Sequence, residues 1–343
     1  MLDPIALTRR LVDIESITGN ELPVSIELEG ILRELASRFG GTVERIPVEP
    51  NRDNLYCVFG DPFVTLTTHM DTVPPFFASS EDAEFIHGRG SCDVKGIIAA
   101  MICAVEYLLS DGLTNIALMF VVGEERNSVG AYFAGKNPKG PHQFVINGEP
   151  TENRSALGSK GALRLELSAK GKMAHSAYPE LGESAIEKLL DALEKVRRVQ
   201  LPVSEILGPS TLNIGLINGG RAPNVIPDSA KAELLIRLVD DGNSTVAAIR
   251  EACEPAVEVA EVLRIPAVLL GSMDGFDTMV ASYTTDIPAF QGAWGQPYLL
   301  GPGTIHVAHT SEERIPKRQL LDAVGIYQKM VRTLLSRCHP VSK

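Results

Sequence analysis

The chain has little of what a secreted, membrane-spanning or nucleic-acid-binding protein needs. Its 343 residues include one tryptophan and an odd set of five cysteines with no C-x-x-C pair. This set favours reduced thiols over a disulfide framework or a zinc ribbon. Positive charge is also scarce, since the chain has 32 Lys and Arg residues against 43 Asp and Glu residues. The resulting net charge of −11 repels phosphate backbones and anionic lipid surfaces. We therefore expect neither nucleic acid nor a membrane as a partner.

Long hydrophobic runs are missing as well. The longest apolar stretch, Gly96–Leu109, contains Glu106 and is too short for a bilayer span of roughly 20 residues, so we expect a buried helix there. The first 16 residues carry scattered charges and no apolar block followed by a small-residue cleavage site. This predicts no secretory signal and a cytoplasmic location. With 44% hydrophobic and 22% charged residues, the chain can build a large core.

Apolar residues recur with a helical period in some segments and form short continuous runs in others. The helical segments are 4–14, 22–39, 96–109, 128–134 and 317–335, and the runs typical of strands are 42–47, 55–59, 63–68, 116–122, 144–146 and 297–300. Continuous apolar strands that alternate with helices are typical of a parallel sheet covered on both faces. The pattern predicts an α/β domain with a mostly parallel sheet flanked by helices.

The middle of the chain has a different pattern. Segments 162–171, 211–219 and 232–239 alternate apolar and polar residues, as half-buried strands do, while 185–196 and 244–253 have the helical period. We therefore expect a small α+β domain inserted at about 158–264. The α/β domain is then discontinuous, with residues 1–157 and 265–343.

Acidic residues and histidines follow four of the predicted buried strands. They are His69 and Asp71, Glu124 and Glu125, Glu149, and His309. Ligands of open α/β sheets bind in the crevice beyond the carboxyl ends of the strands, so these side chains are expected to converge. Asp93, in a loop with two glycines, is expected to join them.

Each of these residues has an ordinary structural explanation when it is taken alone. Adjacent acids are common on solvated loops, and Asp93 has the residue type of a helix N-cap. Together, however, two histidines and three carboxylates supply enough ligands for two divalent ions that share one carboxylate. Mixed imidazole and carboxylate ligands favour zinc, with cobalt or manganese as alternatives. Asp71 can accept a hydrogen bond from His69 while the other ring nitrogen binds metal.

Other catalytic motifs fit poorly. In GRGSCD, Asp93 replaces the third glycine of a dinucleotide-binding fingerprint, and the chain has neither a Walker A motif nor a G-x-S-x-G elbow. Cys92 is better explained as a small buried residue than as a nucleophile.

With these residues identified, the sequence resembles the M20 family of metallohydrolases, which includes acetylornithine deacetylase, succinyl-diaminopimelate desuccinylase, aminoacylase and carboxypeptidase G2-like enzymes. The resemblance runs through nearly the whole chain. Its segments, in family order, are TTHMDTVP (67–74), GRGSCDVKG (88–96), VVGEERNSVGA (121–131), NGEPT (147–151), GKMAHSAYPELGESAI (171–186), GGRAPNVIPDSA (219–230) and GPGTIHVAHTSEERI (301–315). It implies that the insert is a lid or dimerisation domain.

The resemblance also implies roles for the clustered residues. His69 and Glu149 would bind one metal ion, and Glu125 and His309 the other. Asp93 would bridge the two ions, Asp71 would orient His69, and Glu124 would act as general base. The family spacing H-x-x-x-E, ending in Glu313, selects His309 over His306. No catalytic role is expected for His87, His142, His306 or His339.

The insert contributes further residues in this family. The resemblance places His175 across a dimer interface as a donor to the developing oxyanion, although a surface histidine would look the same in the sequence. Asn224 and Arg237 match positions that face a substrate carboxylate, and Arg237 also fits a solvated charge on a strand. Asp286, in TTDIP, matches either a contact for a substrate ammonium or ureido group or a simple turn.

The C-terminal segments are most similar to the acetylornithine deacetylase type. We therefore expect a homodimeric, dinuclear metal amidohydrolase that removes an acyl group from an N-acyl amino acid such as N-acetylornithine. Desuccinylase, aminoacylase, dipeptidase and carrier-protein-lysine hydrolase activities remain open, and a catalytically inactive binding protein is a remote alternative.

Overall fold

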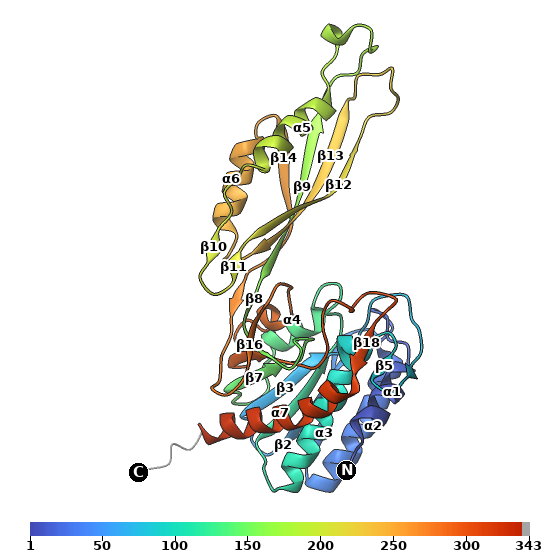
Figure 1. Cartoon of the computed structure of the whole chain (residues 1–343), viewed down its shortest axis with the longest axis vertical. Coiled ribbons are helices and arrows are strands. Elements are labelled where there is room, and N and C mark those ends of the chain that lie inside the picture. Colours follow the sequence, from blue (N-terminus) through green and yellow to red (C-terminus); the bar gives the residue numbers. More distant parts are fainter. Residues whose placement is uncertain (338–343) are drawn as a thin grey trace. The chain divides into compact units, whose positions relative to one another are not determined.

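The computed structural model describes residues 1–337, which form two compact units. Unit 1 comprises residues 1–157, 270–279 and the chain from 285 onward, and unit 2 comprises 158–269 and 280–284 (Figure 1). In the described part of the chain, no helix combines the length and the apolar character that a bilayer crossing requires.

Unit 1 is built on a six-stranded sheet. Its strands, in spatial order, are β1 (Thr42–Glu49), β2 (Arg52–Phe59), β6 (Ile116–Val121), β3 (Val64–His69), β7 (Phe144–Asn147) and β17 (Gln296–Leu299). Strands β6, β3, β7 and β17 run parallel, whereas β1 and β2 are antiparallel to their neighbours. The prediction of a mostly parallel sheet is therefore confirmed.

Both faces of this sheet are covered, which explains its continuous apolar strands. In β6, Ile116, Leu118 and Phe120 pack into a core with residues of four helices: α1 (Pro4–Val12), α2 (Leu22–Phe39), α3 (Gly96–Ser110) and α7 (Lys317–Ser336). Alternate β6 residues such as Met119 pack on the other face with α4 (Val129–Lys136) and the short helix η3 (Ile287–Phe290). Since both sides of each strand are buried, no polar alternation is left in the sequence.

The turn before α3 is not visible in the sequence pattern. The helix begins at Gly96, and residues 91–95 (η1, Ser91–Lys95) form an irregular turn in which Asp93 and Val94 leave the helical conformation. Asp93 is therefore not the N-cap of α3. Apolar periodicity cannot reveal such a turn, because Ser91–Lys95 are all buried.

Unit 2 is a sheet with helices on one face. The antiparallel strands are β12 (Thr211–Gly219), β13 (Ser229–Leu238), β9 (Gly161–Lys170) and β14 (Val257–Ile265), and the helices are α5 (Ala185–Val196) and α6 (Asn243–Cys253) (Figure 1). Sequence reasoning missed β14. Its alternation is interrupted by a bulge between Glu261 and Leu263, and this edge strand is mostly exposed.

Short elements complete the chain. They are β4 (Ser80–Glu81), β5 (Phe85–His87), β8 (Ser155–Ser159), η2 (Pro179–Leu181), β10 (Val203–Ser204), β11 (Gly208–Pro209), β15 (Val268–Leu269), β16 (Thr278–Ala281) and β18 (Arg314–Pro316). Strand β18 pairs with β5 and ties the segment after His309 to the segment before Asp93.

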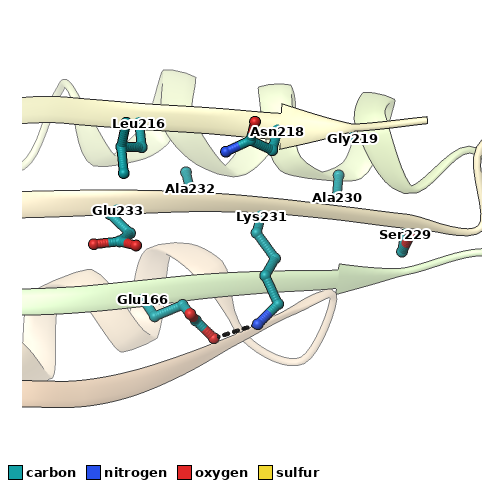
Figure 2. A pocket seen from close by; sticks show the side chains of 9 residues that line it. All are labelled: Glu166, Leu216, Asn218, Gly219, Ser229, Ala230, Lys231, Ala232 and Glu233. Atoms are coloured by element: carbon teal, nitrogen blue, oxygen red, sulfur yellow. Dashed lines mark hydrogen bonds and ion pairs between the residues drawn. The ribbon is translucent and has the colours of Figure 1, made fainter. Parts of the chain in front are cut away.

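The face of the unit 2 sheet that carries no helix bears charged residues together with the exposed Leu216. A hollow of about 320 Å³ lies on this face, and Nζ of Lys231 on β13 lies 2.7 Å from Oε1 of Glu166 on β9. Figure 2 shows this ion pair. Residues of β13 alternate in burial, so Arg237 shares this face with Lys231 and Glu233.

Candidate metal centre

The candidate site lies at one edge of the unit 1 sheet. His69 is the last residue of β3, Glu124 and Glu125 follow β6, and Glu149 follows β7. His309 comes from the loop after β17. Since these four strands are parallel neighbours, their carboxyl ends meet at the same edge.

Three predicted ligands lie within reach of a single ion. One ligand atom each from His69, Asp93 and Glu125 lies within 4.8 Å of the other two. Residues 24 and 56 positions from His69 in the sequence thus lie close to it in the structure. These three residues converge as expected.

Asp93 occupies the middle of the cluster. Its Oδ1 lies 3.1 Å from Nε2 of His69, and its Oδ2 lies 3.2 Å from Nε2 of His309. The same His309 nitrogen lies 3.0 Å from Glu125. Each oxygen of Asp93 therefore faces a different histidine, which is the arrangement that a carboxylate bridging two ions requires.

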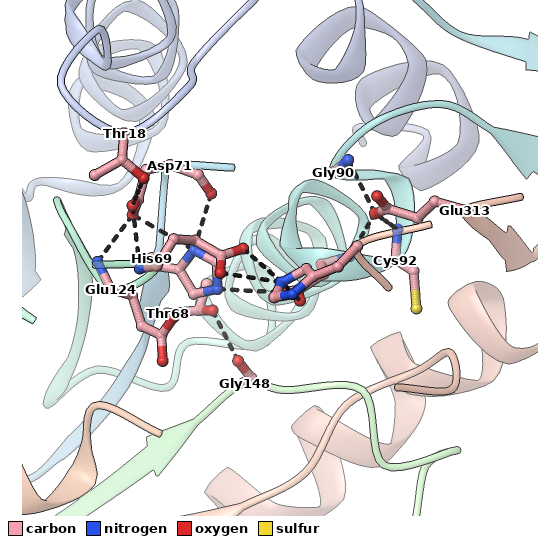
Figure 3. A network of polar contacts seen from close by, with 12 residues as sticks. Thr18, Thr68, His69, Asp71, Gly90, Cys92, Glu124, Gly148 and Glu313 are labelled. Carbon is pink, nitrogen blue, oxygen red and sulfur yellow. Dashed lines mark hydrogen bonds and ion pairs between the residues drawn. The ribbon is translucent and has the colours of Figure 1, made fainter. Parts of the chain in front are cut away.

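Asp71 holds two parts of the site together (Figure 3). Its carboxylate accepts hydrogen bonds from the main-chain N–H groups of Gly123, Glu124 and Glu125 at 3.0, 3.1 and 3.2 Å. It also accepts one from the hydroxyl of Thr18 at 2.8 Å. Asp71 thus fixes the loop that carries the two glutamates.

The contact between Asp71 and His69 differs in detail from the sequence expectation. Nδ1 of His69 lies 3.0 Å from the main-chain carbonyl oxygen of Asp71 and 3.6 Å from its carboxylate. The i, i+2 spacing identifies the correct residue, but the nearer acceptor is the backbone. Either acceptor leaves Nε2 of His69 turned toward Asp93.

The carboxylates of the cluster repel one another. Burial raises the pKa of Glu124 and that of Glu149 well above the ordinary glutamate value, and nearby acids raise both further. Burial also opposes ionisation of Asp93, but hydrogen bonds from His309 and His69 outweigh it and hold the pKa of Asp93 below the ordinary value. Asp93 and Glu125 in turn raise the pKa of His309 to about 10.

This donor set fits divalent cations. Glu149 is 4% exposed, and its Oε1 is buried without a hydrogen-bond partner in the described chain. Buried carboxylates need positive charge or hydrogen bonds, and imidazole with carboxylate is a donor set that zinc accepts. The residues at this edge therefore have both the chemistry and the unmet charge of a metal centre.

Asp286 is placed differently from an open substrate contact. The residue is 1% exposed, and both carboxylate oxygens are buried without a hydrogen-bond partner in the described chain. Burial raises its pKa to about 7, and the charges of His69, Asp71 and Glu125 also act on it. Its role as a contact for a substrate ammonium stays a prediction, and it requires the carboxylate to become exposed.

Two predicted residues of unit 2 lie together on neighbouring loops. The main-chain N–H of Ser176 donates to the carbonyl of Asn224 at 3.0 Å, and His175 forms a bridge with Val225. His175 and Asn224 are exposed, and these loops border a pocket of about 710 Å³.

Arg237 lies at the opposite end of the same sheet. Ser229, which follows the Asn224 loop, pairs with Lys170, whereas Arg237 pairs with Ala162. Eight strand residues at about 3.3 Å each separate the two ends of β13 by roughly 26 Å. A small substrate cannot contact Arg237 and His175 of the same copy of unit 2.

Sequence reasoning missed three residues that support the site. Thr18 contacts Asp71, and Arg89 forms a buried ion pair with Glu313, which the sequence analysis used only as a spacing mark. The signal for Glu313 was its place in HTSEE, although nothing in that pattern shows what it contacts.

The remaining histidines and cysteines lie apart from these contacts. His142 is buried and stacks on Trp294 with ring centroids 4.1 Å apart, and His87 pairs with Asp82. His306 is exposed, and His339 lies outside the described residues. The four described cysteines are free and buried, and burial raises the pKa of the Cys92 thiol well above its ordinary value. This argues against Cys92 as a nucleophile.

The chain is similar to known peptidases in sequence. A family model described as peptidase dimerisation domain matches residues 157–261. A peptidase M20 domain-containing protein of Schizosaccharomyces pombe is 40% identical over 342 residues, which cover 95% of this chain and 84% of the relative. A probable carboxypeptidase of Aspergillus niger is 36% identical over 380 residues, covering 97% of this chain and 90% of the relative.

Solved structures share the fold. The aminopeptidase PepT of Bacillus cereus superposes with a TM-score of 0.80 at 21% identity, covering 97% of this chain and 98% of that chain. At this identity, the likeness concerns the fold.

Proposed function

The chain belongs to the M20 peptidase family, and we propose that it is a dinuclear metal-dependent hydrolase that cleaves an amide bond whose amine side carries a free carboxylate. The observation that carries this proposal is the position of Asp93, whose two oxygens face His69 and His309 separately. A simple surface ion pair does not require one carboxylate placed between two histidines.

In this proposal the ligands divide into two sets. His69 and Glu149 would hold one ion, Glu125 and His309 would hold the other, and Asp93 would serve both. Zinc is the first candidate for these donors, with cobalt and manganese as alternatives. Two divalent ions held there would supply Lewis acidity and lower the pKa of a bound water.

Glu124 is the proposed general base. It lies next to a ligand but is not itself in the ligand set, and its main-chain N–H is held by Asp71. Burial raises the pKa of its carboxyl well above the ordinary glutamate value, so this carboxylate holds a proton more strongly than an exposed glutamate does. Glu124 takes a proton from the attacking water and then delivers it to the leaving nitrogen.

Arg237 is the proposed contact for the substrate carboxylate. Within residues 1–337, its guanidinium forms no hydrogen bond or ion pair, although the side chain is half-buried and burial lowers its pKa. An arginine that is partly desolvated and unpaired is ready for a bidentate carboxylate. The name of the Aspergillus niger relative, a probable carboxypeptidase, fits a substrate of this type.

Two substrate classes meet this requirement. The resemblance of the C-terminal segments favours an N-acyl amino acid, with N-acetylornithine as the first compound to test. The name of the Aspergillus niger relative, a probable carboxypeptidase, favours a short peptide with a free C-terminus. Both release an amino acid with a free carboxylate and need the same metal chemistry.

We further propose a homodimer formed through unit 2. Residues 157–261 match a dimerisation domain, and β12 is an edge strand on which Leu216 and Ile217 are each 54% exposed. Edge strands with exposed apolar residues pair readily with a second copy. Arg237 and His175 of one copy lie at opposite ends of the same sheet. A site that uses Arg237 of one copy would therefore take His175 from the second copy.

A cytoplasmic location also belongs to this proposal. It is supported by the four buried cysteines, which are free thiols in the described chain. Reduced thiols are typical of the cytoplasm.

A substrate panel tests the proposed function. With Zn²⁺ or Co²⁺ present, we expect release of free amine from N-acetyl or N-succinyl amino acids or from short peptides, and none from the same compounds with an amidated carboxylate. R237M should raise KM at least about tenfold, since a bidentate charged contact is lost. R164M, which changes an exposed arginine paired with Glu233, is the control. Equal rates on the free and amidated compounds would contradict the proposal.

Mixing two inactive variants tests whether His175 acts on the other copy. H175A keeps the metal ligands and D93A keeps His175, so a mixed dimer contains one complete site and activity should return. The double variant H175A/D93A mixed with H175A contains no complete site and serves as the control. Native mass spectrometry verifies the mixed dimers, and their inactivity would count against action across the interface.

A further inference from the structure

Glu313 contacts the main chain of the turn that carries Asp93, the proposed bridging ligand. Its side chain is fully buried, and Oε1 accepts the main-chain N–H groups of Gly90, Cys92 and Asp93 at 2.9, 3.2 and 3.1 Å. Figure 3 shows Glu313 beside Gly90 and Cys92. Its other oxygen pairs with the guanidinium of Arg89. One carboxylate thus accepts three N–H groups of the same turn and also pairs with a charged partner.

The segment around Asp93 needs such an acceptor. Asp93 and Val94 have non-helical backbone angles, and Gly90 has a φ of +84°, so these N–H groups do not join a regular helix. A side chain on Gly90 would meet Thr72 and Lys95 within 3.1 Å. The turn is therefore closely packed at Gly90, and buried N–H groups without an acceptor are costly.

Arg89 is itself held in place. It is 1% exposed, its Nε donates to the carbonyl of Pro75 at 3.2 Å, and its guanidinium lies 5.1 Å from the ring centre of Phe77. A buried ion pair needs partners for its remaining hydrogen-bonding groups, and both Nε of Arg89 and Oε1 of Glu313 have them. The ion pair therefore holds the carboxylate of Glu313 in place, and this carboxylate in turn holds the turn that carries Asp93.

Glu313 also belongs to the chain that supplies His309. It follows that histidine by four residues and directly precedes β18, and its carbonyl accepts the N–H of Gly88 at 3.2 Å. The residue therefore ties the turn that carries Asp93 to the segment that carries His309. These are two of the three residues proposed to hold the second ion.

We propose that Glu313, supported by Arg89, is a positioning residue that fixes Asp93 relative to His309 and thereby sets the affinity of the ion shared by Asp93, Glu125 and His309. This rests on the proposed function, since it assumes two ions. The ion held by His69 and Glu149 depends on Glu313 only through Asp93 and is affected less.

The test is a titration of the metal-free protein with Co²⁺, in which calorimetry and visible absorption measure the binding of each ion. Wild type is expected to bind two ions. E313Q places an amide NH₂ against either the three N–H donors or Arg89, and it should weaken the second ion at least about tenfold, the scale on which residues behind metal ligands act. The first ion should weaken by less.

The adjacent Glu312 provides a matched control. Its side chain is 79% exposed, so E312Q makes the same chemical change without touching the turn, and both affinities should equal those of wild type. E313D keeps the charge but withdraws it from the donors by one methylene, and it should weaken the second ion less than E313Q does.

The outcomes separate the two proposals. If wild type binds no second ion, the proposed function itself fails. If wild type binds two ions and E313Q lowers only the melting temperature while both affinities stay unchanged, Glu313 is merely structural and the inference is overturned. Where E313Q does not fold, unchanged affinity of the second ion in folded E313D overturns it equally.

Discussion

Replacing Glu124 with glutamine is expected to lower kcat by roughly 10²–10⁴-fold while both ions stay bound. Glutamine keeps the size of the side chain and the main-chain hydrogen bond to Asp71, but it cannot accept the proton of the attacking water. The proposed ligands His69, Asp93, Glu125, Glu149 and His309 are unchanged. Steady-state kinetics on the best substrate of the panel, with metal content measured on the same sample, checks this result.

E312Q is the control for the E124Q experiment, because it removes a carboxylate from an exposed position. Its kcat should equal that of wild type. Turnover of E124Q at the wild-type rate would exclude Glu124 as the base, whereas loss of metal together with activity would mean that Glu124 is a ligand.

Replacing Asp93 with alanine is expected to remove both ions and all measurable activity. Each oxygen of Asp93 faces one of the two histidines, so the change takes one ligand from each proposed ion. It also leaves the remaining carboxylates without the cations that offset their repulsion. Elemental analysis after dialysis against metal-free buffer measures the loss.

D61A is a suitable comparison for D93A. Asp61 is exposed between β2 and β3, and its removal should leave metal content and rate unchanged. If D93A retained two ions per chain, the bridging arrangement would be wrong, and with it the assignment of the two ligand sets.

Much of this fold can be predicted from the sequence because burial leaves a clear pattern. Strands covered on both faces are continuous apolar runs, and α5 and β12 occupy the predicted ranges 185–196 and 211–219. Strand β14 escapes detection because a bulge and an exposed edge remove the alternation. The turn before α3 escapes because its residues are as buried as the helix itself.

The candidate site divides in the same way. His69, Glu125 and Glu149 are predictable because each follows a buried strand, and parallel strands bring their ends together. The contacts of Glu313 are not predictable, since its partners are main-chain N–H groups that no residue pattern displays. The roles of His175 and Arg237 come from the family resemblance, and only the strand register shows that they lie at opposite ends of a sheet.

The residues with proposed roles come from two different compact units. Every proposed ligand belongs to unit 1, whereas Arg237 and His175 belong to unit 2. Substitutions at Arg237 that change the proposed substrate preference can therefore leave the proposed ligand set intact. Related enzymes could differ in the acids they release while keeping the same inorganic core.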